Sequence, residues 1–507
     1  MNIEITFSAP SQIDTPLLVL PWCQGRERQA ERPSREFDAL DEALGLTLTR
    51  AVAGGDFRGQ RGETLLLYRR GESGPDRVLL VGVGERADLS PERLREVGGH
   101  AASRARELRL TEICLSPAPA WPAGPLELEL AVRAMVEGVV LGQWRFEELR
   151  SEPDEEARRP PLVSLGVLVM DAGVRDEAAT GGAELGRVLA AAQNYARELA
   201  IRPSNIVNPR YLAGEAQRLG EEFGFKVTVL DRGKIEKEGL VAMLAVAAGS
   251  DEEPRFIVME YGRAEGVQPL VLVGKGVTFD AGGLSLKTPE NMEKMKYDMS
   301  GAAAVLGAMR AIAELQLNVN VVGLIPAVEN LPSGHAMRPG DVIGSHSRKT
   351  IEVVNTDAEG RLILADALNY AARYEPEAMV DIATLTGACI VALGHQAIGL
   401  MGNDQELVDE LRVAGDRSGE RAWQLPLWEE YREQMKSEVA DIKNSGGRPA
   451  GTITAAIFLS EFVGSMPWAH LDIAGTAWAE KAGPYQPVGP TGAGVRLLCE
   501  WVRGRAS

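Results

Sequence analysis

Short apolar runs alternate with longer amphipathic stretches along this chain. In the N-terminal part, the apolar runs at 64–68 and 77–84 predict strands. Residues 90–108 have helical periodicity, with Ser90 as N-cap and Pro91 in the first turn. A charged stretch with prolines at 147–161 predicts a surface loop, and the run 163–170 predicts a last strand. The N-terminal part is therefore expected to be an α/β domain.

The C-terminal part repeats the alternation with more regular spacing. The predicted strands lie at 271–273, 319–325, 351–354 and 379–382, and the predicted helices at 301–315, 361–374, 405–418 and 452–463. Strands that alternate with helices favour a mainly parallel central sheet flanked by helices. We expect an N-terminal domain at 1–170, a linker helix region at 171–202 and a C-terminal catalytic domain at 203–507.

Composition excludes several classes of function. The formal charge of −18, from 72 acidic and 54 basic residues, argues against a dominant polyanion-binding surface, so a nucleic-acid partner is not indicated. Four scattered cysteines without a CxxC pair favour reduced thiols and a cytoplasmic location. No signal segment and no apolar run of membrane length are visible, so no membrane partner is expected.

Three common catalytic signatures are missing. The sequence has no HExxH, which excludes a thermolysin-like zinc peptidase, and no GxSxG, which weakens a serine hydrolase interpretation. A phosphate-binding P-loop is absent as well. The five histidines show no spacing of metal ligands, and we interpret all five as structural or surface residues.

The octapeptide Asn-Thr-Asp-Ala-Glu-Gly-Arg-Leu at 355–362 is the first candidate site. It follows an apolar run at 350–354 that predicts a buried strand, and it precedes a predicted helix. In an extended segment, Asp357 and Glu359 would point to one face, as paired metal-binding carboxylates do. Arg361 would place a fixed cation beside them. The alternative is a solvated acidic turn with an ordinary helix cap.

A second stretch, 270–283, is an apolar run followed by a glycine-rich turn that contains Lys275 and Asp280. Lys287 follows, and Asp298 stands at the start of a predicted helix whose first turns are built from small residues. Strand-to-helix junctions are where α/β proteins place their chemistry. Three such junctions supply seven polar residues: Lys275, Asp280, Lys287, Asp298, Asp357, Glu359 and Arg361.

These blocks resemble the leucyl aminopeptidase family, the two-metal cytosol aminopeptidases. Residues 355–362 match the family signature, and 273–283, 294–304, 330–341 and 467–478 match further blocks in the same order. Two departures are visible, since Ala281 stands where the family usually has Ser or Thr and Arg348 where it usually has Gly. The resemblance implies a macro-like α/β N-terminal domain and an α/β catalytic domain.

The resemblance also implies a mechanism. Two divalent ions, zinc or manganese with cobalt or magnesium possible, would hold a bridging hydroxide that attacks the peptide bond. The implied metal ligands are Lys275, Asp280, Asp298, Asp357 and Glu359. Lys287 would act as the electrophile that polarises the carbonyl. Arg361 would hold a bicarbonate ion as proton shuttle.

The family further implies a substrate and an assembly. The substrates would be peptides with a free N-terminus, leucine being preferred within a broad specificity, and the enzyme would be a homohexamer in the cytoplasm. The implied substrate pocket consists of small or apolar residues: Met295, Thr384, Gly387, Ala474 and Ala477.

Two rival functions belong to other classes. A two-metal phosphoesterase would share the carboxylates but would usually recruit histidines. A non-catalytic binding or regulatory relative would need neither Lys287 nor Arg361, so the presence of both argues against it.

Overall fold

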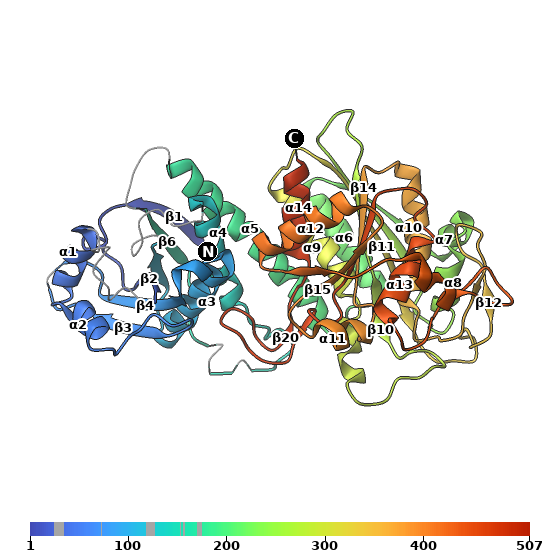
Figure 1. Ribbon diagram of the computed structural model, residues 1–507, viewed down its shortest axis with the longest axis horizontal. Coiled ribbons are helices and arrows are strands. Elements are labelled where there is room, and N and C mark those ends of the chain that lie inside the picture. Colours follow the sequence, from blue (N-terminus) through green and yellow to red (C-terminus); the bar gives the residue numbers. More distant parts are fainter. Residues whose placement is uncertain are drawn as a thin grey trace. The chain divides into compact units, whose positions relative to one another are not determined.

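The computed structural model describes residues 1–24, 35–71, 73–117, 127–152, 154–155, 158–169 and 175–506 (Figure 1). The chain forms two compact units, Met1–Ala191 with Lys481–Pro487, and Ala192–Glu480 with Val488–Ser507. The division falls inside the long helix α5 (Arg175–Ile201). No helix among the described residues is both long and apolar enough to cross a membrane.

The first unit is built on a six-stranded sheet of order β1-β6-β5-β2-β4-β3. Strand β3 pairs antiparallel with β4, and the other neighbours are parallel. The strands are β1 (Asn2–Phe7), β2 (Leu18–Cys23), β3 (Thr64–Tyr68), β4 (Arg77–Gly84), β5 (Glu112–Leu115) and β6 (Ser164–Val169). The helices are α1 (Arg35–Ala43), α2 (Thr47–Ala53), the short 3₁₀ helix η1 (Arg86–Asp88), α3 (Pro91–Glu107) and α4 (Leu128–Gln143).

Burial in the first unit follows its sequence pattern. Strand β4 is buried along nearly its whole length, as a central strand covered on both faces should be. The strands predicted at 64–68 and 77–84 have those bounds in the structure. The predicted last strand ends at Val169, and its expected final residue, Met170, lies outside the described residues.

The second unit is built on a nine-stranded sheet of order β16-β15-β18-β14-β9-β11-β8-β7, with β10 paired to β11. The central neighbours β18, β14, β9, β11 and β10 are parallel, whereas β15, β8 and β7 add antiparallel pairs. The strands of this sheet are β7 (Lys226–Leu230), β8 (Arg255–Gly262), β9 (Leu270–Gly274), β10 (Gly276–Asp280), β11 (Asn320–Asn330), β14 (Ala378–Ala383), β15 (Ile398–Gly402), β16 (Ala422–Gln424) and β18 (Trp468–Asp472).

Helices cover both faces of this sheet. In Figure 1, α9 and α14 lie on one side of it and α10 and α13 on the other. The α-helices are α6 (Pro209–Phe223), α7 (Arg232–Glu238), α8 (Val241–Ala247), α9 (Ser300–Glu314), α10 (Gly360–Ala371), α11 (Gly387–Leu393), α12 (Gln405–Ser418), α13 (Gly451–Ser460) and α14 (Val495–Arg505). Three 3₁₀ helices are η2 (Met292–Tyr297), η3 (Ala372–Tyr374) and η4 (Glu429–Met435). The expected α/β class with a mainly parallel, helix-flanked sheet is confirmed.

One predicted strand of the central sheet is wrong. The run at 350–354 contributes only β13 (Ile351–Glu352), which belongs to a separate three-stranded sheet with β12 (Val342–Ile343) and β17 (Ile442–Lys443). The backbone leaves this ladder because the Val354 N–H donates to a side chain, Asn444 Oδ1. A two-stranded sheet of β19 (Trp478–Ala479) and β20 (Gly489–Pro490) completes the unit.

Candidate active site

The candidate site lies where parallel strands of the second unit end. Lys275 follows β9, Asp280 is the last residue of β10, and Thr384 follows β14. The carboxyl ends of parallel strands meet at one edge of a sheet, which is where α/β folds bind ligands. The Lys275 N–H donates to the Ile382 carbonyl at 3.1 Å, so β9 and β14 stay paired up to the site.

Two glycines let helices approach this edge. A Cβ atom at Gly301, in the first turn of α9, would lie 2.1 Å from the Ile382 carbonyl oxygen. A Cβ atom at Gly360, the first residue of α10, would lie 2.5 Å from Lys275 Cε. The clash at Gly301 is with backbone, so only glycine lets α9 start this close to β14, whereas a side chain at Gly360 would displace the end of the Lys275 side chain.

The octapeptide has a different conformation from the one expected. Asp357 lies in a turn, and Glu359, with φ −79° and ψ −35°, is already helical at the N-cap of α10. The expectation that Asp357 and Glu359 lie in an extended segment is therefore wrong. Its consequence holds, because Asp280, Asp357 and Glu359 each offer one carboxylate oxygen within 4.8 Å of the others. The turn and the helix start produce the convergence.

Lys275 is buried between two of the carboxylates. Its Nζ lies 2.8 Å from Asp298 Oδ2 and 3.0 Å from Glu359 Oε1. It also donates to the Thr384 carbonyl at 3.0 Å, while the Thr384 hydroxyl donates to Asp298 Oδ1 at 2.7 Å. Burial disfavours the charged amine, but Asp298 and Glu359 outweigh it, so the pKa of Lys275 lies above its ordinary value.

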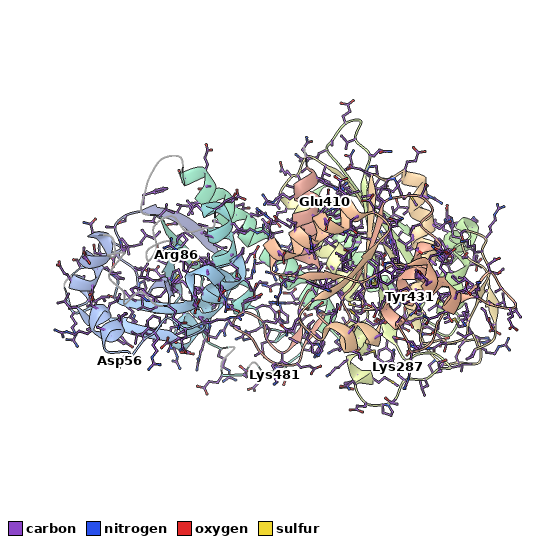
Figure 2. The ribbon with its side chains drawn as sticks, viewed as in Figure 1. Asp56, Arg86, Lys287, Glu410, Tyr431 and Lys481 are labelled. Atoms are coloured by element: carbon purple, nitrogen blue, oxygen red, sulfur yellow. The ribbon has the colours of Figure 1, made fainter. Side chains whose placement is uncertain are left out.

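Lys287, labelled in Figure 2, lies on the loop after β10 and is less buried, with 24% of its side chain exposed. Its Nζ is 2.7 Å from Asp280 Oδ2 and 2.5 Å from Asp357 Oδ1. Burial opposes its charge, but the surrounding carboxylates, Asp280 first, hold the pKa of Lys287 above its ordinary value. The two lysines thus face different carboxylate pairs.

The carboxylates are crowded enough to affect one another. Burial, followed by the charges of Glu359 and Asp298, raises the pKa of Asp280 to about 8. Burial also raises the pKa of Asp298 to about 6, although Lys275 acts in the opposite direction. Burial alone would raise the pKa of Glu359 too, but Lys275 and Lys287 hold it below its ordinary value. Such mutual repulsion is the expected property of ligands arranged for cations.

The donor set fits divalent metal ions. Glu359 Oε2 is buried and has no hydrogen-bond partner among the described residues. Buried carboxylate oxygens are normally paired, and a cation would supply the missing partner. The cluster contains four carboxylates and one amine, and this set of oxygen and nitrogen ligands is one that zinc or manganese ions can bind.

Arg361, in the first turn of α10, is buried at the N-terminal end of that helix. Its Nη1 donates to the Asn444 carbonyl at 2.9 Å, and its Nε has no hydrogen-bond partner among the described residues. Burial lowers the pKa of Arg361 to about 10. A buried guanidinium with a spare donor is suited to a small oxyanion.

Sequence reasoning passed over a second layer of polar residues. The Thr356 hydroxyl donates to the Gly282 carbonyl at 2.6 Å and accepts from the Ser285 N–H at 2.7 Å. Asn330, at the end of β11, donates to Asp280 Oδ1 at 2.8 Å and to the Thr356 carbonyl at 3.1 Å. The sequence signal for Asn330 was its position as a polar residue at the end of the apolar run of β11.

Two of the residues predicted to line the substrate pocket, Met295 and Ala477, lie near an aromatic contact in the chain. The rings of Tyr297 and Trp478 lie 5.5 Å apart between centroids. Met295 is two residues before Tyr297, and Ala477, which is buried, directly precedes Trp478. The contact therefore brings η2 and β19 together beside the metal-site candidates.

The segments that carry the other predicted pocket residues are linked through Asp472, the last residue of β18. Its Oδ1 accepts from the Leu385 N–H at 3.3 Å and from the Ala474 N–H at 3.1 Å. Thr384 lies on the loop that contains Leu385, Gly387 is the first residue of α11 directly after that loop, and a Cβ at Gly387 would meet nothing within 4 Å. The loop after β14 and the loop after β18 are thus held next to each other, with open space at Gly387.

Comparison with known families gives two matches that together cover most of the chain. The model described as "Cytosol aminopeptidase family, catalytic domain" matches residues 194–499, and the model of that family's N-terminal domain matches residues 19–153.

Similar proteins carry the same description. The chain is 47% identical over 505 residues to a probable cytosol aminopeptidase of Geobacter sp. (strain M21), covering 99% of this chain and 100% of that one. It is 50% identical over 465 residues to a probable cytosol aminopeptidase of Syntrophotalea carbinolica, covering 91% of this chain and 92% of that one.

Two solved structures are similar along nearly the whole length. A mutant of tomato leucine aminopeptidase superimposes with a TM-score of 0.87 at 35% identity, covering 99% of this chain and 96% of that one. The bottromycin maturation enzyme BotP in complex with Mn superimposes with a TM-score of 0.84 at 32% identity, covering 97% of this chain and 100% of that one.

Proposed function

We propose that this chain, which belongs to the cytosol aminopeptidase family, removes N-terminal residues from peptides with a preference for leucine within a broad specificity. The family consists of metal-dependent aminopeptidases with two metal ions. The observation that carries the proposal is the convergence of Asp280, Asp357 and Glu359 at the end of parallel strands, between the amines of Lys275 and Lys287.

The metal ligands in this proposal are Lys275, Asp280, Asp298, Asp357 and Glu359. Lys275 would bind as the neutral amine, because bound cations would offset the carboxylate charges that raise its pKa. The orphaned oxygen of Glu359 and the mutual repulsion of the carboxylates support that assignment. When bound, two divalent ions would polarise the substrate carbonyl and lower the pKa of a water molecule. Zinc or manganese suits this mixed oxygen and nitrogen set, with cobalt or magnesium as alternatives.

Lys287 is proposed as the electrophile. Its ammonium keeps its charge beside Asp280 and Asp357, and it is the more exposed of the two lysines, so a substrate can reach it. A fixed cation at the scissile carbonyl would stabilise the negative charge that develops on the oxygen in the transition state.

Arg361 is proposed to hold a bicarbonate ion that accepts a proton from the attacking water. The spare Nε donor and the desolvated guanidinium support an anion there. General-base catalysis of this kind contributes about a hundred- to ten-thousandfold in rate. Bicarbonate-depleted wild type should therefore slow and recover when bicarbonate is added. Arg361→Ala should respond much less, with both metals still bound; an equal response would leave Arg361 without this role.

The side-chain preference is assigned to Met295, Thr384, Gly387, Ala474 and Ala477. Small residues at the last two positions and open space at Gly387 would admit a branched aliphatic side chain. The substrate is proposed to be a peptide with a free N-terminus, because its α-amine would approach the metal cluster.

A homohexamer in the cytoplasm is proposed from the family alone; the relatives' name, cytosol aminopeptidase, supports the location. Light scattering should then give about six times the subunit mass of 54.6 kDa. A monomer at micromolar concentration would reject the hexamer but would leave the proposed aminopeptidase activity unaffected.

The deciding assay compares two substrates. Leucine p-nitroanilide should be hydrolysed and p-nitrophenyl phosphate should not, and a chelator should abolish the first activity. Phosphatase activity alone would favour the two-metal phosphoesterase. No activity on either substrate with both metals bound would favour a binding protein.

A further inference from the structure

Asn444 lies directly after β17 and is completely buried, with 0% exposure. Its side-chain oxygen accepts from the N–H groups of Val354 and Asn355 at 2.9 and 3.3 Å. Its side-chain nitrogen donates to the carbonyls of Asn355 and Ala358 at 2.7 and 3.3 Å. One side chain therefore satisfies four backbone groups of the turn that carries Asp357.

The backbone of the same residue makes two further bonds. Its N–H donates to the Glu352 carbonyl at 2.9 Å, which continues the pairing of β17 with β13. Its carbonyl accepts from Arg361 Nη1 at 2.9 Å. Asn444 thus bonds the octapeptide on both sides of the two carboxylates, at Asn355 before them and at Arg361 after them.

We infer that Asn444 is a positioning residue, which sets both the turn that presents Asp357 and Glu359 and the direction of the Arg361 guanidinium. This inference rests on the proposed function. Asparagine suits the task because it donates and accepts from one planar group, and an aspartate of equal size cannot donate. A carboxylate at this position would instead place an oxygen next to the carbonyl oxygens of Asn355 and Ala358, and the repulsion between these oxygens would displace the turn.

Two consequences separate this role from general support of the fold. Displacing ligands by removing a bond behind them typically costs about ten- to a hundredfold in metal affinity. Displacing Arg361 should lower kcat even when the metals are saturating. A residue that only stabilises the loop would change the melting temperature without either effect.

The test uses Asn444→Asp in the full-length enzyme, with Asn403→Asp as a control at an exposed position away from the site. Asn403 also holds backbone with its side chain, since it accepts from the Trp468 N–H and donates to the Met466 carbonyl, but it lies at the end of β15. The Mn²⁺ concentration that gives half of the maximal increase in Tm is measured together with kcat and KM for leucine p-nitroanilide. We expect that Mn²⁺ midpoint to rise about tenfold or more in Asn444→Asp, and kcat at saturating Mn²⁺ to fall about tenfold or more. The control should stay within about twofold of wild type for both quantities.

A double mutant tests whether Asn444 acts through Arg361. In an Arg361→Ala background, Asn444→Asp should lower kcat at saturating Mn²⁺ by less than about threefold, because the group it positions is gone. Equal losses in both backgrounds would overturn the inference, and so would a wild-type Mn²⁺ midpoint and kcat in the single variant.

Folding and activity are controlled separately. If Asn444→Asp gives no folded protein, Asn444→Ser is measured against the same two criteria, since its hydroxyl can still bond one of the backbone groups. Metal-loaded wild type without activity would reject the proposed function. In that case the Mn²⁺ midpoint of the Asn444 variant still decides whether this residue positions the ligands.

Discussion

The side-chain amide of Asn330 donates to Asp280 Oδ1 at 2.8 Å across the parallel pair β10 and β11, in which the two residues are register partners. The Gly282 N–H donates to the same oxygen at 2.9 Å. One oxygen of Asp280 is therefore held by the protein, and the other, Oδ2, points to the side of Lys287. Orientation of a metal-binding carboxylate by hydrogen bonds behind it is the usual arrangement in metal sites.

Replacing Asn330 with Ala should therefore weaken metal binding without unfolding the protein. We expect the Mn²⁺ dissociation constant to rise about ten- to a hundredfold, because Asp280 loses its orientation. Calorimetric titration of the metal-free enzyme measures this directly. Asn320→Ala is the control, because Asn320 lies at the other end of β11 and bonds the backbone of Ala264. Equal changes in affinity for the two variants would contradict the explanation.

The two lysines should separate metal binding from catalysis. Lys287→Ala should lower kcat about a hundredfold or more, as loss of a donor to a developing oxyanion does, while metal content stays near two ions per subunit. Lys275→Ala should lose occupancy of one metal, since its buried amine lies between Asp298 and Glu359. Metal analysis alongside kinetics measures both, and the opposite pattern would reject this division of roles.

Asp366 should make stability depend on pH. It is buried in α10, accepts from the N–H groups of Met243 and His346, and burial raises its pKa to about 7. Its pKa is higher in the folded than in the unfolded state, so the folded state loses stability as pH rises from about 4 to 7, by up to about 4 kcal/mol.

The variant Asp366→Asn removes this ionisation and serves as the reference. The unfolding free energy of wild type minus that of the variant, measured in urea, should be lower at pH 8 than at pH 5. Any hydrogen bond that Asn fails to make is a constant offset and does not change the sign. A difference that is independent of pH would show that Asp366 does not titrate in this range.

Arg348 should be a site for stabilisation. It adopts φ +70°, a left-handed conformation that strains a residue with a Cβ atom. Arg348→Gly should raise the free energy of unfolding by about 0.5–1 kcal/mol, after subtracting the greater freedom of glycine in the unfolded chain. Arg348→Ala keeps the Cβ atom, so an equal gain in that variant would contradict the strain argument.

The alternation of apolar runs and helical periodicities predicted most of the fold. Strand β4 has its predicted bounds because a buried strand in a mainly parallel sheet is a nearly continuous apolar run. Strand β3 also has its predicted bounds, although it is a partly buried edge strand that pairs antiparallel with β4. The pattern at 350–354 failed because an apolar run does not show which sheet receives it. The two antiparallel strands β7 and β8 were also not predicted, although Gly224 and the stretch 249–254 are turn signals directly before them.

The candidate site was easier to predict than the contacts that support it. Charged residues at strand-to-helix junctions stand out, so Asp280, Asp357 and Glu359 could be selected and are brought together in the structure. The conformation of the octapeptide was wrong because spacing does not distinguish a turn from an extended segment. Asn444 carried no visible signal, since its role depends on a strand pairing, β13 with β17, that follows from tertiary structure.

The central claim is that two metal ions bound by this cluster are required for aminopeptidase activity. The most direct measurement is the rate of leucine p-nitroanilide hydrolysis by exhaustively metal-free enzyme during titration with Mn²⁺ or Zn²⁺. We expect no activity without metal and full recovery as two ions per subunit bind. Full activity of the metal-free enzyme would contradict it.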